Sequence, residues 1–286
     1  MMLHIDRAMT RAGVGARAGS GGQYLRLGIA ALSVVGLVTV LYVGHIAASD
    51  GFAYYAHAYW QADPYGIAEN SPDAFVYSPP ALLVSQALHQ LPWPVFLEGY
   101  SALIALGVWV LAGPFTLLLT FTPQVASEIT LGNIHVFLAI VAVFGLRWPG
   151  LWAFALLTKI TPGVGVLWFT FRGEWRKLAI ALGVTAAIAL PTMALAPSLW
   201  LDWLGVLGQG ARQTDGGPLL LRLPLAVVVL WIGARRDWPW VVPLASMLGL
   251  PILWSVHGLS MLLGVVWYLR RVGPGAGGGV ARFPRP

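Results

Sequence analysis

An aspartate and a lysine stand out in an otherwise apolar sequence, because together they could support proton transfer beside an anionic substrate. Asp50 follows a long apolar run and lies at the start of the aromatic-rich segment 49–60. Partial desolvation at a membrane surface raises the pKa of a carboxyl group toward the range that suits a general base. Asp also accepts hydrogen bonds at helix N-termini, so an N-cap is the alternative interpretation, and the two roles can coexist.

Lys159 lies well inside an apolar segment, just before Pro162. An unpaired charge at the centre of a membrane helix costs about 2.5–3.5 kcal/mol on insertion scales. The ammonium therefore needs a partner, either a carboxylate such as Glu128 or a bound anion. A structural ion pair and a substrate-binding role both remain open for Lys159.

His257 and Tyr77 are further candidates at the ends of apolar runs. His257 begins the last run, where it is either a hydrogen-bonded residue of the membrane interface or a substrate contact near Asp50. Tyr77 precedes Pro79 and Pro80, a pattern that predicts the start of a helix. The other histidines have no metal-ligand spacing, and no phosphate-binding loop or nucleophile elbow is present. We therefore expect no metal site and no cofactor.

Composition indicates that lipid is the solvent for most of the chain. Of 286 residues, 58% are apolar and 10% are charged, and the mean hydropathy is +0.74. A soluble domain has roughly 45–50% apolar and about 25% charged residues. The arginines behind the net charge of +6 separate apolar runs instead of clustering, which is typical of topology signals and not of nucleic-acid binding. We predict an all-α polytopic membrane protein.

Apolar runs near the ~20 residues of a spanning helix define the predicted spans. They are 25–48, 94–113, 132–146, 150–171, 177–196, 218–234, 238–254 and 256–269. Two less regular stretches, 77–91 and 115–131, must both cross or both fail to cross, so the prediction is eight or ten transmembrane helices. One transmembrane domain, 24–271, lies between a flexible basic cytoplasmic arm, 1–23, and a flexible cytoplasmic tail, 272–286.

The basic residues predict the orientation, because cytoplasmic loops are enriched in Lys and Arg. Thirteen of the 17 fall on one side, namely Arg7, Arg11, Arg17, Arg26, Arg172, Arg176, Lys177, Arg235, Arg236, Arg270, Arg271, Arg282 and Arg285. Arg147, Arg212 and Arg222 fall on the other. Both termini are therefore predicted to be cytoplasmic in a multi-pass protein of the cell membrane. The interval 49–77, the loop 198–217 and the turn 254–257 are predicted to be external.

The first external interval contains a predicted short interfacial helix. Phe52, Tyr55 and Tyr59 form an aromatic stripe at helical spacing. Such a helix lies on the outer leaflet and does not cross it. The architectural expectation is an external site assembled from distant loops.

Several segments, in this order, resemble the motifs of glycosyltransferase family 87, the polyprenol-phosphate-mannose-dependent mannosyltransferases with the GT-C membrane fold. The resembling segments are Asp50 to Tyr65 with Asp63-Pro64-Tyr65, Tyr77-Ser78-Pro79-Pro80, Gly132-Asn133-Ile134-His135 without the family's Gln, Lys159-Ile160-Thr161-Pro162, and Trp254-Ser255-Val256-His257 with an altered order and one His. The resemblance extends over about residues 40–265.

The resemblance implies an inverting glycosyltransferase that moves mannose from a polyprenyl-phosphate donor to an extracytoplasmic glycolipid or glycan. By this resemblance, Asp50 is the catalytic base and His257 binds the donor. Lys159 or Arg222 balances phosphate charge. Tyr54, Tyr77 and Asn133 complete the implied substrate-binding set. The alternatives are a lipid-linked-sugar transporter or flippase, and a noncatalytic subunit with a GT-C-like fold.

Overall fold

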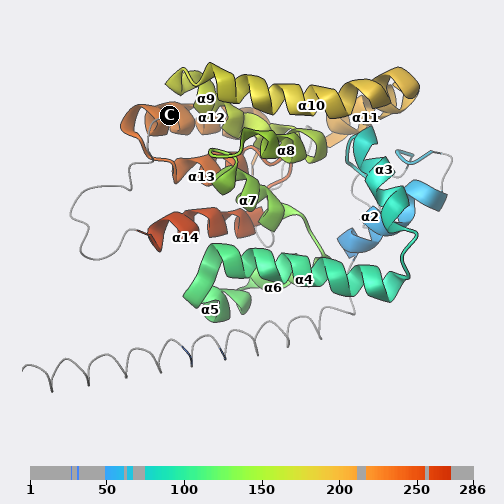
Figure 1. Ribbon diagram of the computed structural model, residues 1–286, viewed down its shortest axis with the longest axis horizontal. Helices are drawn as coiled ribbons and strands as arrows, with labels where there is room; N and C mark the ends of the chain where they lie inside the picture. The colour runs from blue at the N-terminus through green and yellow to red at the C-terminus, as the bar shows by residue number, and fades with distance from the viewer. Residues whose placement is uncertain are drawn as a thin grey trace, which may run out of the picture.

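The structure, a computed structural model, describes residues 27, 31, 49–60, 63–66, 75–210, 217–254 and 258–271. Every regular element in these residues is helical (Figure 1). The prediction of an all-α polytopic membrane protein is confirmed. The predicted arm 1–23, the tail 272–286 and most of the first span lie outside the described residues, so those boundaries stay predictions.

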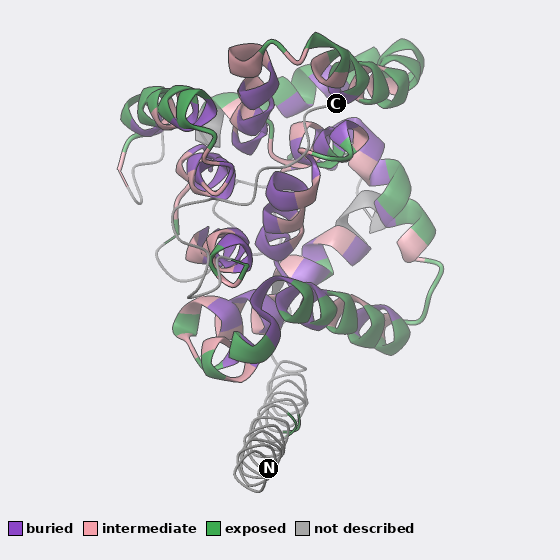
Figure 2. Cartoon of the chain, turned by 60° about the vertical axis from the view of Figure 1, so that its left-hand side comes forward, coloured by how far each residue is buried: buried purple, intermediate pink, exposed green. Residues whose placement is uncertain are grey.

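Two helical segments in the described residues are long and apolar enough to cross a membrane. The first, Trp93–Thr120, is formed by α4 (Trp93–Ala112), η1 (Gly113–Phe115) and α5 (Thr116–Thr120). The second is α10 (Trp175–Leu195), whose most apolar window is only 6% buried. Figure 2 shows buried residues gathered in the centre of the chain and exposed ones on the outermost helices. Such an apolar, exposed helix surface is suited to lipid.

A bent pair of helices follows the first long segment. In it, α6 (Pro123–Leu131) and α7 (His135–Phe144) meet at 110°, so they form either one broken span or a re-entrant loop. With this pair counted as a span, the described residues contain up to three membrane-crossing segments by length and composition. The number of crossings in the whole chain, eight or ten, stays a prediction.

The predicted continuous span 150–171 is instead a hairpin. η2 (Pro149–Leu151) and α8 (Trp152–Thr158) form one arm, and η3 (Thr161–Val166) and α9 (Leu167–Arg172) form the other. The arms pack so closely that a Cβ at Gly165 would overlap the indole ring of Trp152. Pro162, with no backbone N–H to donate, and the missing side chain of Gly165 together explain why the chain turns back here.

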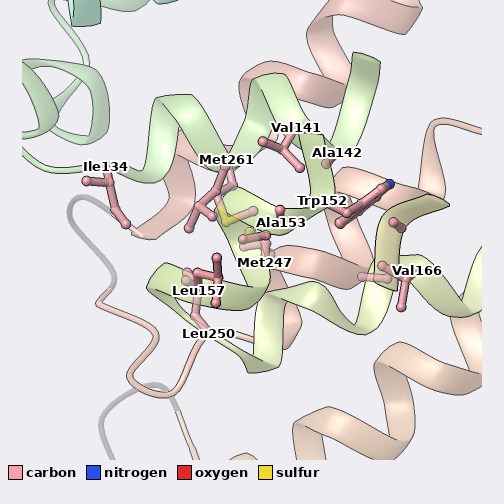
Figure 3. Close-up of a cluster of buried hydrophobic side chains, with 14 of the residues drawn as sticks. Ile134, Val141, Ala142, Trp152, Ala153, Leu157, Val166, Met247, Leu250 and Met261 are labelled. Atoms are coloured by element: carbon pink, nitrogen blue, oxygen red, sulfur yellow. The ribbon is translucent and has the colours of Figure 1, made fainter. Parts of the chain in front are cut away.

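Of the C-terminal elements, α12 and α13 pack against the second arm of this hairpin, and η4 and α14 pack against α13 and α7. The bounds of these elements are Leu219–Arg236 for α12, Val241–Leu248 for α13, Gly258–Leu262 for η4 and Leu263–Leu269 for α14. Figure 3 shows the core that α13 and η4 share with α7 and α8, in which Met247 and Met261 belong to one cluster with Trp152 and Leu157. Methionine fills such irregular gaps well because its side chain is unbranched and flexible.

One end of the molecule is formed by α2 (Ser49–Trp60), α3 (Pro79–Leu88) and α11 (Pro197–Gly210). Figure 1 shows these helices around one end of α10 and α9 at the other. The helix α2 coincides with the short helix predicted from its aromatic stripe. Ser78 is the N-cap residue of α3, and two prolines follow it in the first turn, as the Pro-Pro pattern predicts.

The opposite end collects basic residues. Arg172 Nη1 donates to Asp237 Oδ1 at 2.7 Å, which joins the turns after α9 and α12. Arg270 Nη1 donates to the Leu111 carbonyl at 2.7 Å, so the last residues of α14 lie beside the C-terminus of α4. A cation near a helix C-terminus is stabilised by the helix dipole.

Arg147 also lies at this basic end, whereas the charge pattern placed it on the other side. Its guanidinium sits over the ring of Trp148, which stacks on Phe144. Phe144 in turn contacts Trp267, the ring beneath Arg271. The chain of rings forms because α7 ends beside α14, a contact that charge counting does not reveal.

The direction of α4 gives a testable topology. If 77–91 crossed the membrane, α4 would run outward. Leu111 would then lie on the side opposite to Arg270, which the charge pattern predicts to be cytoplasmic, and this arrangement is incompatible with their hydrogen bond. We therefore expect Gln90 and Arg176, both exposed, to lie on opposite sides. Single cysteines at these positions of this cysteine-free chain should react with an impermeant thiol reagent from opposite faces. Labelling of both from the same face would contradict this arrangement and support a membrane crossing by 77–91.

Candidate active site

Asp50 and Asn133 are far apart in sequence and in contact in the structure. Asn133 Nδ2 donates to Asp50 Oδ2 at 2.5 Å. Asn133 is fixed in turn, because its Oδ1 accepts the Ile134 N–H at 2.7 Å. Asp50 lies inside the first turn of α2, and its described hydrogen bond goes to Asn133 in the turn between α6 and α7. Its position therefore favours the interpretation as a site residue over that as a simple N-cap.

Glycine at position 132 makes this contact possible. Gly132 ends α6 in the left-handed conformation, with φ of 70°. A Cβ there would lie 3.2 Å from the Cα of Gly51. Two backbones therefore meet where neither residue has a side chain, and this brings Asp50 within reach of Asn133.

Three tyrosines surround this contact. Tyr77 Oη donates to Tyr54 Oη at 2.9 Å, and their rings meet edge-on at 5.1 Å. Tyr100 packs edge-on to Tyr54 at 6.0 Å. Its hydroxyl is buried and has no hydrogen-bond partner within the described residues. The sequence analysis identified Tyr54 and Tyr77, but missed Tyr100, which lies in an apolar helix with no motif around it.

The segment 75–78 is held by three other parts of the chain. Tyr65 Oη donates to the Tyr77 carbonyl at 2.8 Å, and Trp203 Nε1 donates to the Val76 carbonyl at 3.1 Å. The Ser78 hydroxyl and N–H both donate to the Leu157 carbonyl at the end of α8. These bonds fix the backbone that carries Tyr77 against the hairpin that carries Lys159.

Lys159 lies at the tip of the hairpin, directly after α8, with extended backbone geometry. Its Nζ is 3.0 Å from His135 Nε2, and His135 Nδ1 is 3.2 Å from Glu128 Oε2. The expected carboxylate is therefore Glu128, but a histidine stands between the two charges. The sequence analysis found no metal-ligand spacing for His135 and quoted it in the segment Gly132 to His135, but missed this role.

The environment of Asp50 raises its pKa above the ordinary value of 3.8. Desolvation by burial is the largest cause, and the negative charge of Glu128 acts in the same direction. The charge of Lys159 and the hydrogen bond from Asn133 act against this rise. Lys159 is therefore close enough to act electrostatically on Asp50, and the site contains a basic carboxylate beside a cation.

Arg222 lies elsewhere and binds backbone. Its Nε donates to the Gly217 carbonyl at 2.8 Å, and its Nη1 donates to Leu248 and Leu250 at 2.9 and 2.7 Å. Its Nη2 donates to the Pro251 carbonyl at 2.9 Å. Four of the five N–H groups of a guanidinium are thus used on carbonyls. This geometry favours a structural role at the C-terminus of α13, and phosphate binding by Arg222 stays a prediction.

His257 lies outside the described residues, so its proposed contact with the donor stays a prediction. The next residue, Gly258, is described, and its N–H donates to the Trp254 carbonyl at 3.0 Å. Within the described residues, no group of three or more His, Asp or Glu side chains is placed to hold a metal ion.

Fold and site together define an all-α membrane protein with a desolvated carboxylate, a supported lysine and a tyrosine lining. The sequence profile of glycosyltransferase family 87 matches residues 75–281, more than half of the chain. The chain belongs to glycosyltransferase family 87, and it is a membrane glycosyltransferase. The matched range includes Asn133 and Lys159 and begins after Asp50. Searches among curated proteins and solved structures gave no significant match.

Proposed function

We propose that this glycosyltransferase transfers mannose from a polyprenyl-phosphate donor to a hydroxyl of an extracytoplasmic glycolipid or glycan, with inversion at the anomeric carbon. The observation that carries the proposal is the desolvated Asp50 carboxylate, which accepts a hydrogen bond from Asn133 and whose pKa is lowered by the charge of Lys159. A general base and a cation side by side suit a reaction that removes a proton and releases a phosphate.

In the proposed reaction, the Asp50 carboxylate accepts the proton of the acceptor hydroxyl as its oxygen attacks the anomeric carbon. A bond forms between this oxygen and the anomeric carbon, and the bond from that carbon to the phosphate oxygen breaks. The lipid phosphate leaves with the electron pair. The Lys159 ammonium offsets the developing charge more strongly in a dry site than it would in water. His257 is proposed to contact the donor as well.

Tyr100 supports the presence of a polar ligand in this site. A buried hydroxyl without a partner costs about 1–3 kcal/mol, and the hydroxyl of Tyr100 is in this state in the described structure. A sugar hydroxyl would supply the missing hydrogen bond. Tyr54 and Tyr77 fix each other through their hydroxyls, so their rings form a rigid wall for such a ligand.

The proposed function is tested with purified protein in lipid nanodiscs, polyprenyl-phosphate mannose and candidate acceptors. Because Asp50 must be ionised and its pKa is raised, transfer should fall about tenfold per pH unit below a midpoint that lies above 3.8. Loss of the Lys159 charge in Lys159→Met should move this midpoint to higher pH, since that charge lowers the pKa of Asp50. A product sugar with retained anomeric configuration, or a rate that does not fall on acidification, would contradict the proposal.

A further inference from the structure

Glu128 is a fully buried carboxylate that contacts three partners among the described residues. Its Oε1 accepts the Val136 N–H at 2.9 Å, in the first turn of α7. Its Oε2 accepts the Ser260 hydroxyl at 3.2 Å and lies 3.2 Å from His135 Nδ1. An anion at a helix N-terminus is favoured by the helix dipole. These bonds suit an ionised carboxylate, because backbone N–H and hydroxyl groups both donate to it.

His135 links this carboxylate to Lys159. With Glu128 ionised, Nδ1 carries the hydrogen and donates to the carboxylate, which leaves Nε2 as an acceptor. Lys159 Nζ, a donor only, lies 3.0 Å from that Nε2. Donors and acceptors therefore match along the whole series when lysine is positive, histidine neutral and glutamate negative.

The intervening ring has an electrostatic consequence. A carboxylate in direct contact with Lys159 would offset most of the attraction of the ammonium for another anion, because Coulomb interactions are strongest at short distance. The imidazole of His135 separates the Glu128 carboxylate from the Lys159 ammonium, and its Nε2 still accepts a hydrogen bond from that ammonium. Lys159 is thus held in place without losing its attraction for a second anion.

We propose that Glu128 and His135 are positioning residues for phosphate recognition, which hold the Lys159 ammonium where the phosphate of the lipid-linked donor meets Asp50. This inference rests on the proposed function, since it assigns the anion to the donor's phosphate. Neither positioning residue touches the substrate. Both act through the charge and the placement of Lys159.

The chain has two lysines, Lys159 and Lys177, which makes the inference directly measurable. Lys177 bonds to Glu174 at 2.9 Å, at the opposite end of the molecule. Isotope labelling of lysine side chains gives two NMR signals, which Lys177→Arg assigns. The nanodisc-embedded protein is titrated with polyprenyl monophosphate, and with the uncharged polyprenol as the matched ligand. Transfer rates are measured on the same samples.

The expected result is a shift of the Lys159 signal with the phosphate and not with the alcohol. His135→Phe and Glu128→Gln should weaken phosphate binding and kcat/KM by about 10–100-fold, the loss of a charge-assisted hydrogen bond. Ser260→Ala, which leaves two of the described bonds to Glu128, should have a smaller effect. The control Glu174→Gln should move the Lys177 signal and leave phosphate affinity unchanged. An unchanged Lys177 signal in the other variants shows that they are folded.

Folded His135 and Glu128 variants that bind phosphate and transfer sugar as the wild type does would overturn the inference and leave the proposed function standing. A Lys159 signal that does not shift when polyprenyl monophosphate is added, in protein that still transfers sugar, would have the same two consequences. If the wild type binds phosphate through Lys159 and the variants weaken this binding, but no sugar is transferred, the positioning role holds and the transfer reaction is rejected.

Discussion

Replacing Asp50 by Asn should reduce sugar transfer by about 10²–10⁴-fold, the range that general bases contribute. The change preserves the size of the side chain, and the new amide oxygen can still accept the hydrogen bond from Asn133. It removes the basic oxygen that receives the acceptor's proton. Initial transfer rates at saturating donor measure the loss, while the affinity for polyprenyl phosphate should change little.

Asp63→Asn is the matched control for this experiment. Asp63 is exposed, and its Oδ1 accepts the Tyr65 N–H at 3.2 Å, a bond that an Asn oxygen can also accept. We expect transfer within about twofold of the wild type, as for surface substitutions away from buried features. An Asp50→Asn variant with the wild-type rate would exclude Asp50 as the base. Lipid-linked sugar moved across the bilayer without a new glycosidic bond would favour a transporter instead.

Replacing Arg222 by Met should destabilise the protein by about 2–4 kcal/mol. The guanidinium is buried and donates to four backbone carbonyls, those of Gly217, Leu248, Leu250 and Pro251. Each buried acceptor left without a partner costs about 1–3 kcal/mol, although neighbouring groups recover part of this. Denaturant or thermal unfolding in a fixed detergent measures the change. The stability of Arg222→Lys should lie between those of the wild type and Arg222→Met, because a single ammonium cannot reach all four carbonyls.

Arg235→Met is the matched control, since Arg235 lies on the same helix and is exposed, with its guanidinium over the ring of Trp231. Its loss should cost under about 1 kcal/mol. The Arg222 comparison also separates two hypotheses. Unchanged stability with lost phosphate binding would restore the substrate-binding role that the resemblance implies. A loss of stability, with normal phosphate affinity in the protein that remains folded, would establish the structural role of Arg222.

Much of the candidate site could be predicted from the sequence, because unusual residues are conspicuous in an apolar chain. Asp50 and Lys159 were selected in this way, and Asn133 was selected through the family resemblance. The structure brings Asp50 and Asn133 into a hydrogen bond. His135 and Tyr100 were missed. The roles of His135 and Tyr100 depend on their contacts with Lys159 and Tyr54, which only folding supplies.

Glu128 shows how far sequence reasoning reached. The cost of burying Lys159 called for a partner, and Glu128 was a candidate. The insertion of His135 between them could not be inferred, because it depends on the 110° angle between α6 and α7. For Arg222, the chemistry of a guanidinium suits phosphate and carbonyl oxygens alike. Only the neighbours found in the structure favour carbonyl binding by Arg222 over phosphate binding.

The sequence by itself determined that this is an all-helical membrane protein, because the balance of apolar and charged residues is a sum over the chain that does not depend on folding. It also marked the short helix at Asp50, whose aromatic spacing is local. Only the tertiary structure decided that 150–171 turns back at Lys159 and that Arg147 lies at the basic end. The physical reason is that hydropathy measures the preference of a segment for lipid, whereas a reversal at Pro162 and Gly165 depends on close contact with Trp152.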